Sequence, residues 1–296
     1  MNAYLIYTDS AADIPQEIYA KYDIRIIPMD YVVNEKLMTF YTERADHDQI
    51  CDSLYRAQRE GADVHTSQIT PFRYTEIWTK ELEEGQDILY LSFSSGMSAT
   101  WQNAVMAAEE LKENYPDRTI RVIDSLSATG GQGVLTYTAA INREKGMSLE
   151  ENAAWLEANA KYMCHRFTVG DLDYLHKGGR ISGAAALVGG LLNIKPVLII
   201  DDEGKLEVVS KCRGKHAALK MMVKSYQTEQ GVPDVPKLVF ITHSGLYEEA
   251  EKLKEMVEAV AEAGTQVYTI CQTPIIGSHT GPDFLSVCGF GYHRKQ

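Results

Sequence analysis

Small hydroxyl, acidic and glycine residues gather where several expected strands end. In an open parallel sheet, the carboxyl ends of the strands lie along one edge, and ligands bind there. A helix that begins at this edge presents unpaired N–H groups and the positive end of its dipole, which suit an anion. A single turn of this kind is more simply explained as a helix cap. The recurrence favours a ligand contact in at least one of them: Thr8-Asp9-Ser10, Ser94-Ser95-Gly96, Asp124-Ser125 and His243-Ser244-Gly245.

Two further clusters contain groups that can hold a carboxylate. The hydroxyls of Thr66-Ser67-Gln68 precede a helix expected from Pro71, so they bind a carboxylate or cap that helix, and capping is the simpler function for this cluster alone. His279 stands near Gly281 in an expected loop close to the chain end. It either donates to an anion or is a structural turn histidine.

A glycine-rich run extends from Leu175 to Gly183, and its glycines allow positive φ or close backbone approach. It lacks the G-x4-G-K-[ST] spacing of a nucleotide phosphate loop. The small apolar residues at 184–192 favour a core helix over the wall of a tunnel for an alkyl chain. The basic cluster 211–215 is typical of a solvated loop, or it meets a partner or a phosphate.

Other chemistries find little support. The patterns H-E-x-x-H, G-x-S-x-G, and G-x-G-x-x-G after a strand are all absent from the sequence. The five cysteines are scattered and form no C-x-x-C pair, so we expect reduced thiols and no metal site. A serine hydrolase that uses Ser94 or Ser95 with His279 stays open, because such triads are assembled in space.

Charge and hydropathy further restrict the class of protein. The 29 basic and 41 acidic residues give a net charge of −12, and an acidic surface repels a phosphate backbone, so we expect no nucleic-acid partner. Residues 1–8 lack the basic stretch of a secretory signal. The most apolar run, 181–194, is shorter than the roughly 18–20 residues that span a membrane. We therefore expect a cytoplasmic protein.

Short apolar strands alternate with amphipathic helices, which is typical of an α/β fold with mostly parallel sheets flanked by helices. The expected strands are 3–8, 25–33, 87–93, 119–123, 196–200, 206–210, 237–242 and 266–270, with 196–200 and 206–210 forming a hairpin. One helix is expected to begin near Pro15. The other expected helices are 46–59, 71–84, 98–114, 133–144, 148–163, 214–230 and 247–263. Ser148 and Glu151 form a capping box.

The length of 296 residues suggests two domains. A new unit begins near Cys164, so we expect an N-terminal α/β domain over 1–163 and a C-terminal α/β domain over 164–296, with a possible crossover of the chain between them.

Taken in order, the motifs of this chain resemble those of the DegV family of bacterial fatty-acid-binding proteins. Each motif is weak alone, but the ordered set is specific and covers essentially the whole chain. It consists of Thr8-Asp9-Ser10-Ala11-Ala12-Asp13, Thr66-Ser67-Gln68, Ser94-Ser95-Gly96-Met97-Ser98, Asp124-Ser125, Leu175-His176-Lys177-Gly178-Gly179-Arg180-Ile181, Lys195-Pro196, Arg213-Gly214 and His279-Thr280-Gly281-Pro282.

The resemblance implies two α/β domains with one long-chain fatty acid in a cleft between them and no other cofactor. It implies that the carboxylate is held by Thr66, by Ser94 or Ser95, and by His279 with its neighbour Thr280. Ser95 is favoured because it sits beside Gly96 at the turn.

The same resemblance implies that Arg180 and Arg213 face an ATP-dependent fatty acid kinase. That separate kinase phosphorylates the acid for phospholipid synthesis. We expect this protein to contact a membrane surface only transiently. The chain itself would then have no catalytic residues.

Three positions depart from the family pattern. Ile69 stands where a proline often follows the TSQ motif, and Ala99 where glycine is common. Asp283 replaces a glycine and is expected to place a carboxylate near the anion site. Two other readings therefore remain: a lipid-acting hydrolase with a Ser/His pair, and a carrier of another hydrophobic acid.

Overall fold

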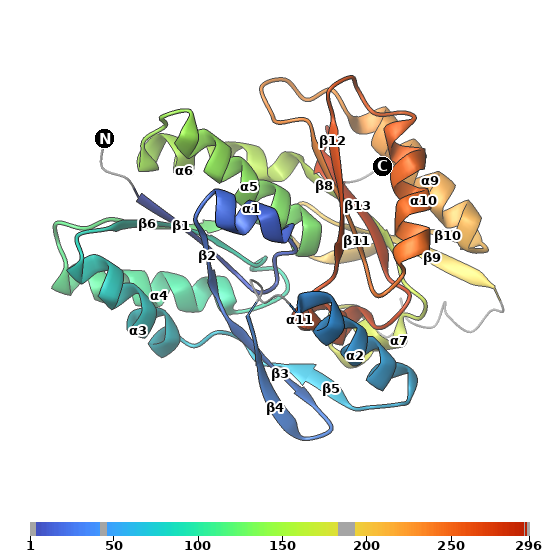
Figure 1. Cartoon of the computed structure of the whole chain (residues 1–296), viewed down its shortest axis with the longest axis horizontal. Helices are drawn as coiled ribbons and strands as arrows, with labels where there is room; N and C mark the ends of the chain where they lie inside the picture. The colour runs from blue at the N-terminus through green and yellow to red at the C-terminus, as the bar shows by residue number, and fades with distance from the viewer. Residues whose placement is uncertain (1–3, 42–45, 183–192, 293, 295–296) are drawn as a thin grey trace.

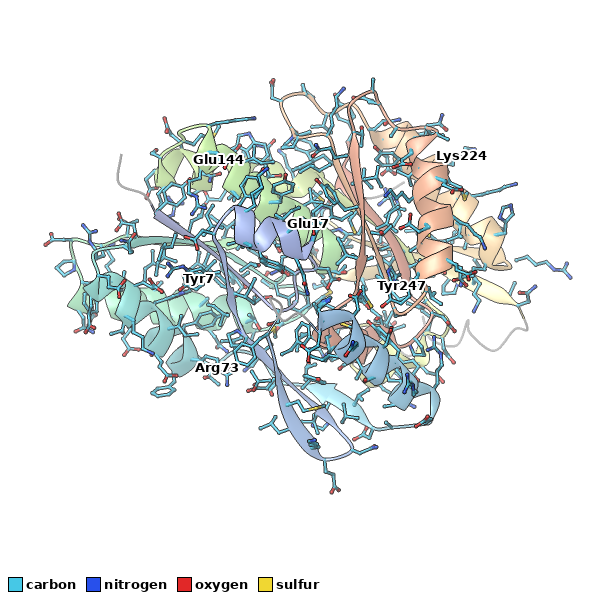
Figure 2. All side chains as sticks on the ribbon, viewed as in Figure 1. Tyr7, Glu17, Arg73, Glu144, Lys224 and Tyr247 are labelled. Atoms are coloured by element: carbon cyan, nitrogen blue, oxygen red, sulfur yellow. The ribbon has the colours of Figure 1, made fainter. Side chains whose placement is uncertain are left out.

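The computed structural model describes residues 4–41, 46–182, 193–292 and 294, and it contains two large sheets and one small sheet (Figure 1). The expected apolar element at 184–192 lies outside the described residues. Charged side chains such as Glu17, Glu144 and Lys224 lie on the outer faces (Figure 2). No helix among the described residues is long and apolar enough to cross a membrane.

The first sheet is entirely parallel, with the order β2-β1-β6-β7, as expected for the N-terminal half. Helices α3 and α4 cover one face, and α1, α5 and α6 cover the other (Figure 1). The strands are β1 (Tyr4–Asp9), β2 (Ile24–Ile27), β6 (Asp87–Ser92) and β7 (Ile120–Asp124). The helices are α1 (Gln16–Lys21), α3 (Pro71–Glu83), α4 (Thr100–Asn114), α5 (Thr129–Glu144) and α6 (Leu149–Asn159).

The second sheet has the order β10-β9-β8-β13-β11-β12 and confirms the mixed α/β class, but the expectation that it is mostly parallel is wrong. Only β11 and β12 pair in parallel. The physical reason is that two strands run against their neighbours: β13, near the chain end, enters between β8 and β11, and β9 lies between β8 and its hairpin partner β10. The strands are β8 (Met163–Thr168), β9 (Ile194–Ile200), β10 (Leu206–Arg213), β11 (Leu238–His243), β12 (Gln266–Cys271) and β13 (Leu285–Phe290). Its helices include α9 (Lys215–Glu229) and α10 (Tyr247–Glu258).

The small sheet, β4-β3-β5, was not expected as a separate unit. The strand predicted at 25–33 is broken at Pro28, which has no N–H to donate to a ladder. The chain therefore pairs with β1 before the proline and with β4 and β5 after it. The strands are β3 (Met29–Val33), β4 (Lys36–Phe40) and β5 (Val64–Thr66). Beside them lie α2 (His47–Arg59) and α11 (Pro274–Thr280), with α7 (Asp173–Lys177) against α11 (Figure 1).

Other elements follow the prediction closely. The hairpin of β9 and β10 is confirmed, although β10 contains a bulge between Val208 and Ser210. The capping box is also confirmed: the Ser148 hydroxyl accepts a hydrogen bond from the Glu151 N–H, and the Glu151 carboxylate accepts one from the Ser148 N–H. Residues 160–162, expected as the end of that helix, form a short 3-10 turn. The second large sheet begins at Met163, and a boundary between domains at 163/164 stays our proposal.

One apolar core joins the two large sheets. Leu5 and Tyr90 of the first sheet and Phe167, Leu198 and Phe284 from the second sheet and its loops belong to the same cluster of buried side chains. Burying apolar area is the main favourable term in folding, so this shared core holds the two halves against each other.

Asp9 is a fully buried carboxylate at the end of β1. Its oxygens accept hydrogen bonds from the Ala11 N–H at 3.0 Å and the Gln132 side-chain amide at 3.1 Å, and from the Tyr90 hydroxyl at 2.7 Å and the Phe93 N–H at 3.0 Å. Burial raises the pKa of Asp9, and these four donors oppose that change. The carboxylate therefore ties together the ends of β1 and β6 and the first turn of α5.

We expect Asp9→Asn to lower the free energy of unfolding by about 2–5 kcal/mol, because the new amide group faces at least one donor that loses its acceptor. Tyr90→Phe, which deletes one of the four donors, should cost about 1–2 kcal/mol. Urea unfolding followed by circular dichroism measures both. A cost of Asp9→Asn that is no larger than that of Tyr90→Phe would contradict the central role of Asp9.

Candidate functional site

Thr66 and His279, predicted from distant motifs, form a hydrogen bond of 2.7 Å between the Thr66 hydroxyl and Nε2 of the imidazole. Thr66 ends β5, and His279 lies in the last turn of α11. The expectation that His279 sits in a loop is therefore wrong, because the segment from Pro274 forms a short helix. The two side chains meet because α11 packs against β3 and β5.

His279 is neutral at pH 7. Burial lowers its pKa to about 4, and the charges of Arg180 and His65 act in the same direction. Gly178 packs against the ring so closely that a Cβ at this position would lie 2.6 Å from Nδ1 of His279. The imidazole is therefore a hydrogen-bonding group rather than a counter-ion.

A cavity of about 450 Å³ opens beside this pair. We call it the mouth cavity. Its polar lining residues are Thr66, Ser67, Gln68, Ser98, Arg180 and His279. Its apolar lining residues include Met29, Phe93, Met97, Ile275 and Ile276. The hydroxyl, imidazole and guanidinium groups suit an anionic head group, whereas the apolar side chains suit hydrocarbon.

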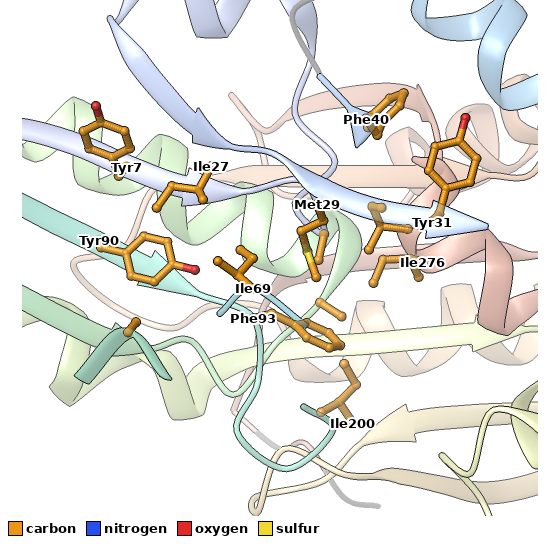
Figure 3. Packing of buried hydrophobic residues seen from close by; sticks show 14 of the residues in the cluster. Tyr7, Ile27, Met29, Tyr31, Phe40, Ile69, Tyr90, Phe93, Ile200 and Ile276 are labelled. Carbon is orange, nitrogen blue, oxygen red and sulfur yellow. The ribbon is translucent and has the colours of Figure 1, made fainter. Parts of the chain in front are cut away.

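A smaller cavity of about 50 Å³ continues inward and shares Phe93, Met97, Arg180, Ile276 and His279 with the mouth. We call it the tail cavity. It lies between the second sheet, which contributes Phe167 from β8 and Ile200 from β9, and the carboxyl edge of the first sheet, from which come Phe93 after β6 and Ala128 before α5. Figure 3 shows Phe93 between Ile276 and Ile200. Phe93 and Ile276 line both cavities, whereas Ile200 lines the tail cavity alone. Polar groups thus gather at the mouth, and the open surface of the tail cavity is apolar.

Arg180, expected to face a kinase, lines both cavities and is half-buried. Its guanidinium donates a hydrogen bond to the Gly178 carbonyl oxygen. Burial lowers the pKa of Arg180, but an arginine side chain stays protonated in proteins. A permanent cation therefore stands beside the neutral His279.

The two serines expected at the head group lie elsewhere in this structure. Ser94 is fully buried; its hydroxyl donates to the Gly204 carbonyl oxygen at 2.8 Å and accepts from the Gly96 N–H at 3.2 Å. The Ser95 side chain is exposed, and its N–H donates to Asp124 at 3.2 Å. Neither serine lines the mouth or tail cavity. Ser98, three residues beyond Ser95 in the same motif, lines the mouth instead, and sequence reasoning missed it.

The remaining predicted residues are spread around this centre. Thr280 lines the tail cavity, and its hydroxyl donates to Gln272 at 2.8 Å. Arg213 is exposed at the end of β10 and touches neither cavity. Asp283, expected near the anion site, lies 3.4 Å from Arg59 in an exposed ion pair. Its carboxylate is therefore partly neutralised by Arg59 and lines neither cavity.

Catalytic and metal chemistry gain no support from this arrangement. The hydrogen-bond partner of His279 is Thr66 rather than either serine of the hydrolase hypothesis, and the Ser94 hydroxyl donates to the Gly204 carbonyl oxygen. Within the described ranges, no cluster of three or more His, Cys, Asp or Glu side chains could hold a metal ion.

Comparisons with known proteins agree over nearly the full length. The model of the DegV family, described as one of uncharacterised proteins, matches residues 4–291. The DegV domain-containing protein CPE0026 of Clostridium perfringens is 37% identical over 291 residues, with 98% of each chain covered.

Two solved structures are also similar. One, described as showing fatty acid binding of a DegV family protein from Thermus thermophilus, has a TM-score of 0.84 at 29% identity, covering 99% of this chain and all of that one. A DegV lipid-binding protein from Thermotoga maritima has a TM-score of 0.84 at 27% identity, with both chains fully covered. The full-length match to the family model and the 37% identity together place this chain in the DegV family.

Proposed function

We propose that this protein is a fatty-acid-binding carrier that holds one long-chain fatty acid between its two halves. The observation that carries this proposal is the joined pair of cavities, polar at the mouth and apolar within. The similar proteins of Thermus thermophilus and Thermotoga maritima, described as binding fatty acid and lipid, support it.

In this proposal the carboxylate lies at the mouth cavity and replaces the hydrogen bond between Thr66 and His279. The Thr66 hydroxyl and the imidazole N–H then both donate to the carboxylate, and Arg180 supplies a positive charge. A buried carboxylate that lacks partners costs several kcal/mol, so these groups are needed to offset its desolvation. Thr280 lies on the inner side of the same site. Ser94 or Ser95 joins it only if the turn at Gly96 reorients, because the Ser94 hydroxyl is engaged with Gly204 and Ser95 faces solvent.

The alkyl chain extends into the tail cavity. Burial of about 14 methylenes contributes a gross term of about 11 kcal/mol, which association entropy partly offsets. The tail cavity of about 50 Å³ is too small for such a chain, so its walls must separate when the acid enters. Phe93 and Met97 stand at the junction and are the side chains that must move first.

The carrier presents its carboxylate to a separate ATP-dependent fatty acid kinase in the cytoplasm. A carboxylate oxygen attacks the γ-phosphorus of ATP, ADP leaves, and the acyl-phosphate proceeds to phospholipid synthesis, with transient contact at a membrane surface. The exposed Arg213 faces the kinase, whereas Arg180 remains with the head group and the phosphate it receives. No ATP-binding loop is recognisable in the sequence, so the carrier needs this partner. A carrier of another hydrophobic acid would use the same cavities.

Replacement of Thr66 or His279 by Ala should weaken oleate binding about 5- to 100-fold, because each change removes a hydrogen bond to a charged group worth about 1–3 kcal/mol. Isothermal titration calorimetry measures the affinity, and native mass spectrometry identifies any acid that co-purifies. Thr228→Ala on α9 is a matched control, because it removes an exposed hydroxyl that lines neither cavity. Wild-type affinity in both variants would refute this carboxylate site, and ester hydrolysis by the purified protein would favour the hydrolase instead.

Arg213→Ala should reduce kinase-dependent phosphorylation of oleate while binding stays within about twofold of wild type, since Arg213 lies outside both cavities. Arg180→Ala should weaken both, because Arg180 lines them. The assay contains carrier, ATP, Mg²⁺ and oleate with and without a fatty acid kinase, and Lys112→Ala on α4 is the control for a lost surface charge. Turnover without the kinase would show that the protein is itself an enzyme.

A further inference from the structure

His279 is contributed by the C-terminal half, but the helix that carries it is held by the N-terminal half. The Tyr55 hydroxyl of α2 donates to the Gln272 carbonyl oxygen at 2.8 Å, just before α11 begins. The Gln58 side-chain amide, one turn later on α2, donates to the Gly277 carbonyl oxygen at 3.0 Å. Both donors are buried, at 0% and 2% exposure. In such a site each bond is costly to lose.

Gly277 allows the two helices to approach this closely. A Cβ placed on Gly277 would lie 2.6 Å from the Tyr55 hydroxyl oxygen and 2.8 Å from Cε1 of its ring. Real Cβ contacts are not that short, so any side chain here would push α11 away from α2. Gly277 precedes His279 by two residues, and such a displacement would carry the imidazole with it.

The start of α11 is fixed from the same half of the chain. The Thr273 N–H donates to the buried Asp13 carboxylate at 2.8 Å, and the Thr273 hydroxyl donates to the Ser10 carbonyl oxygen at 2.8 Å. Thr66, the partner of His279, also belongs to this half. The N-terminal half thus supplies both the hydroxyl that the imidazole meets and the groups that set where the imidazole stands.

From these contacts we infer that Tyr55 and Gln58 are positioning residues for His279: they clamp α11 so that the imidazole stays on the Thr66 hydroxyl at the mouth cavity. Neither residue lines the mouth or tail cavity, so neither would touch the fatty acid there. They act through the backbone of α11. The inference deepens the proposed carrier function and rests on it only for the ligand, because the clamp itself is a property of the protein alone.

The test compares Tyr55→Phe and Gln58→Met with Tyr4→Phe. Tyr55→Phe deletes one hydroxyl, and Gln58→Met deletes the amide at similar volume. Tyr4→Phe is the matched control: Tyr4 is also a buried tyrosine that donates to a backbone carbonyl, that of Met147, but it stands at the start of β1 and makes no hydrogen bond to α11. Gly277→Ala is a further variant that displaces α11 without deleting a hydrogen-bonding group.

The first readout needs no ligand. NMR titration of the histidine side chains gives the pKa of His279, which is about 4 in the intact site. Release of α11 should expose the imidazole and raise this pKa toward the ordinary value in Tyr55→Phe, Gln58→Met and Gly277→Ala, but not in Tyr4→Phe. An unchanged His279 pKa in all three clamp variants would overturn the inference, whether or not the protein binds fatty acid.

The second readout is oleate affinity. Each clamp variant should lose about 5- to 20-fold, as for one hydrogen bond lost indirectly. In the His279→Ala background, Tyr55→Phe should cause no further loss, because its effect passes through the imidazole. An additive loss in that double variant would overturn the inference. Absence of oleate binding in the wild type would instead refute the proposed ligand. The His279 pKa in the three clamp variants would then decide whether Tyr55 and Gln58 position the imidazole.

Discussion

The buried carboxylate of Asp9 is the constraint on which the scaffold of the site depends. An ionised carboxylate without partners could not remain in an apolar core, so four donors must converge on it. Those donors come from the chain after β1, from β6 and the loop that follows it, and from α5. Their convergence fixes the carboxyl edge of the first sheet. Phe93, whose N–H is one of the four donors, also lines both the mouth cavity and the tail cavity.

Buried hydrogen bonds also join the two halves of the chain at α11. Helix α11 belongs to the C-terminal half by sequence, but this helix and the two residues before it are hydrogen-bonded to the N-terminal half. The acceptors are Asp13 and Ser10, and the donors are Tyr55 and Gln58. Because these contacts are buried, the position of His279 depends on how the halves pack. The fatty acid that we propose as ligand would therefore enter beside the contacts that hold His279 in place.

The electrostatics of the mouth cavity differ from those of the whole protein. The net charge of −12 would repel an anion, yet at the mouth Arg180 stays cationic and His279 is neutral. The neutral imidazole limits the local charge to one cation. In the carrier that we propose, hydrogen bonds and a single positive charge hold the fatty acid carboxylate at this mouth.

The sequence by itself determined the α/β class, the parallel first sheet, the β9–β10 hairpin and the capping box of α6, because these follow from hydrophobic period, turn residues and caps that act over a few residues. It also singled out Thr66 and His279. Only the tertiary structure decided that these two meet at 2.7 Å, that Arg180 lines the cavities, and that Ser94 bonds to Gly204. The antiparallel insertion of β13 was likewise hidden. Each of these facts depends on which distant segments pack together, since a side chain's partner is chosen by the assembled fold and not by its neighbours in sequence.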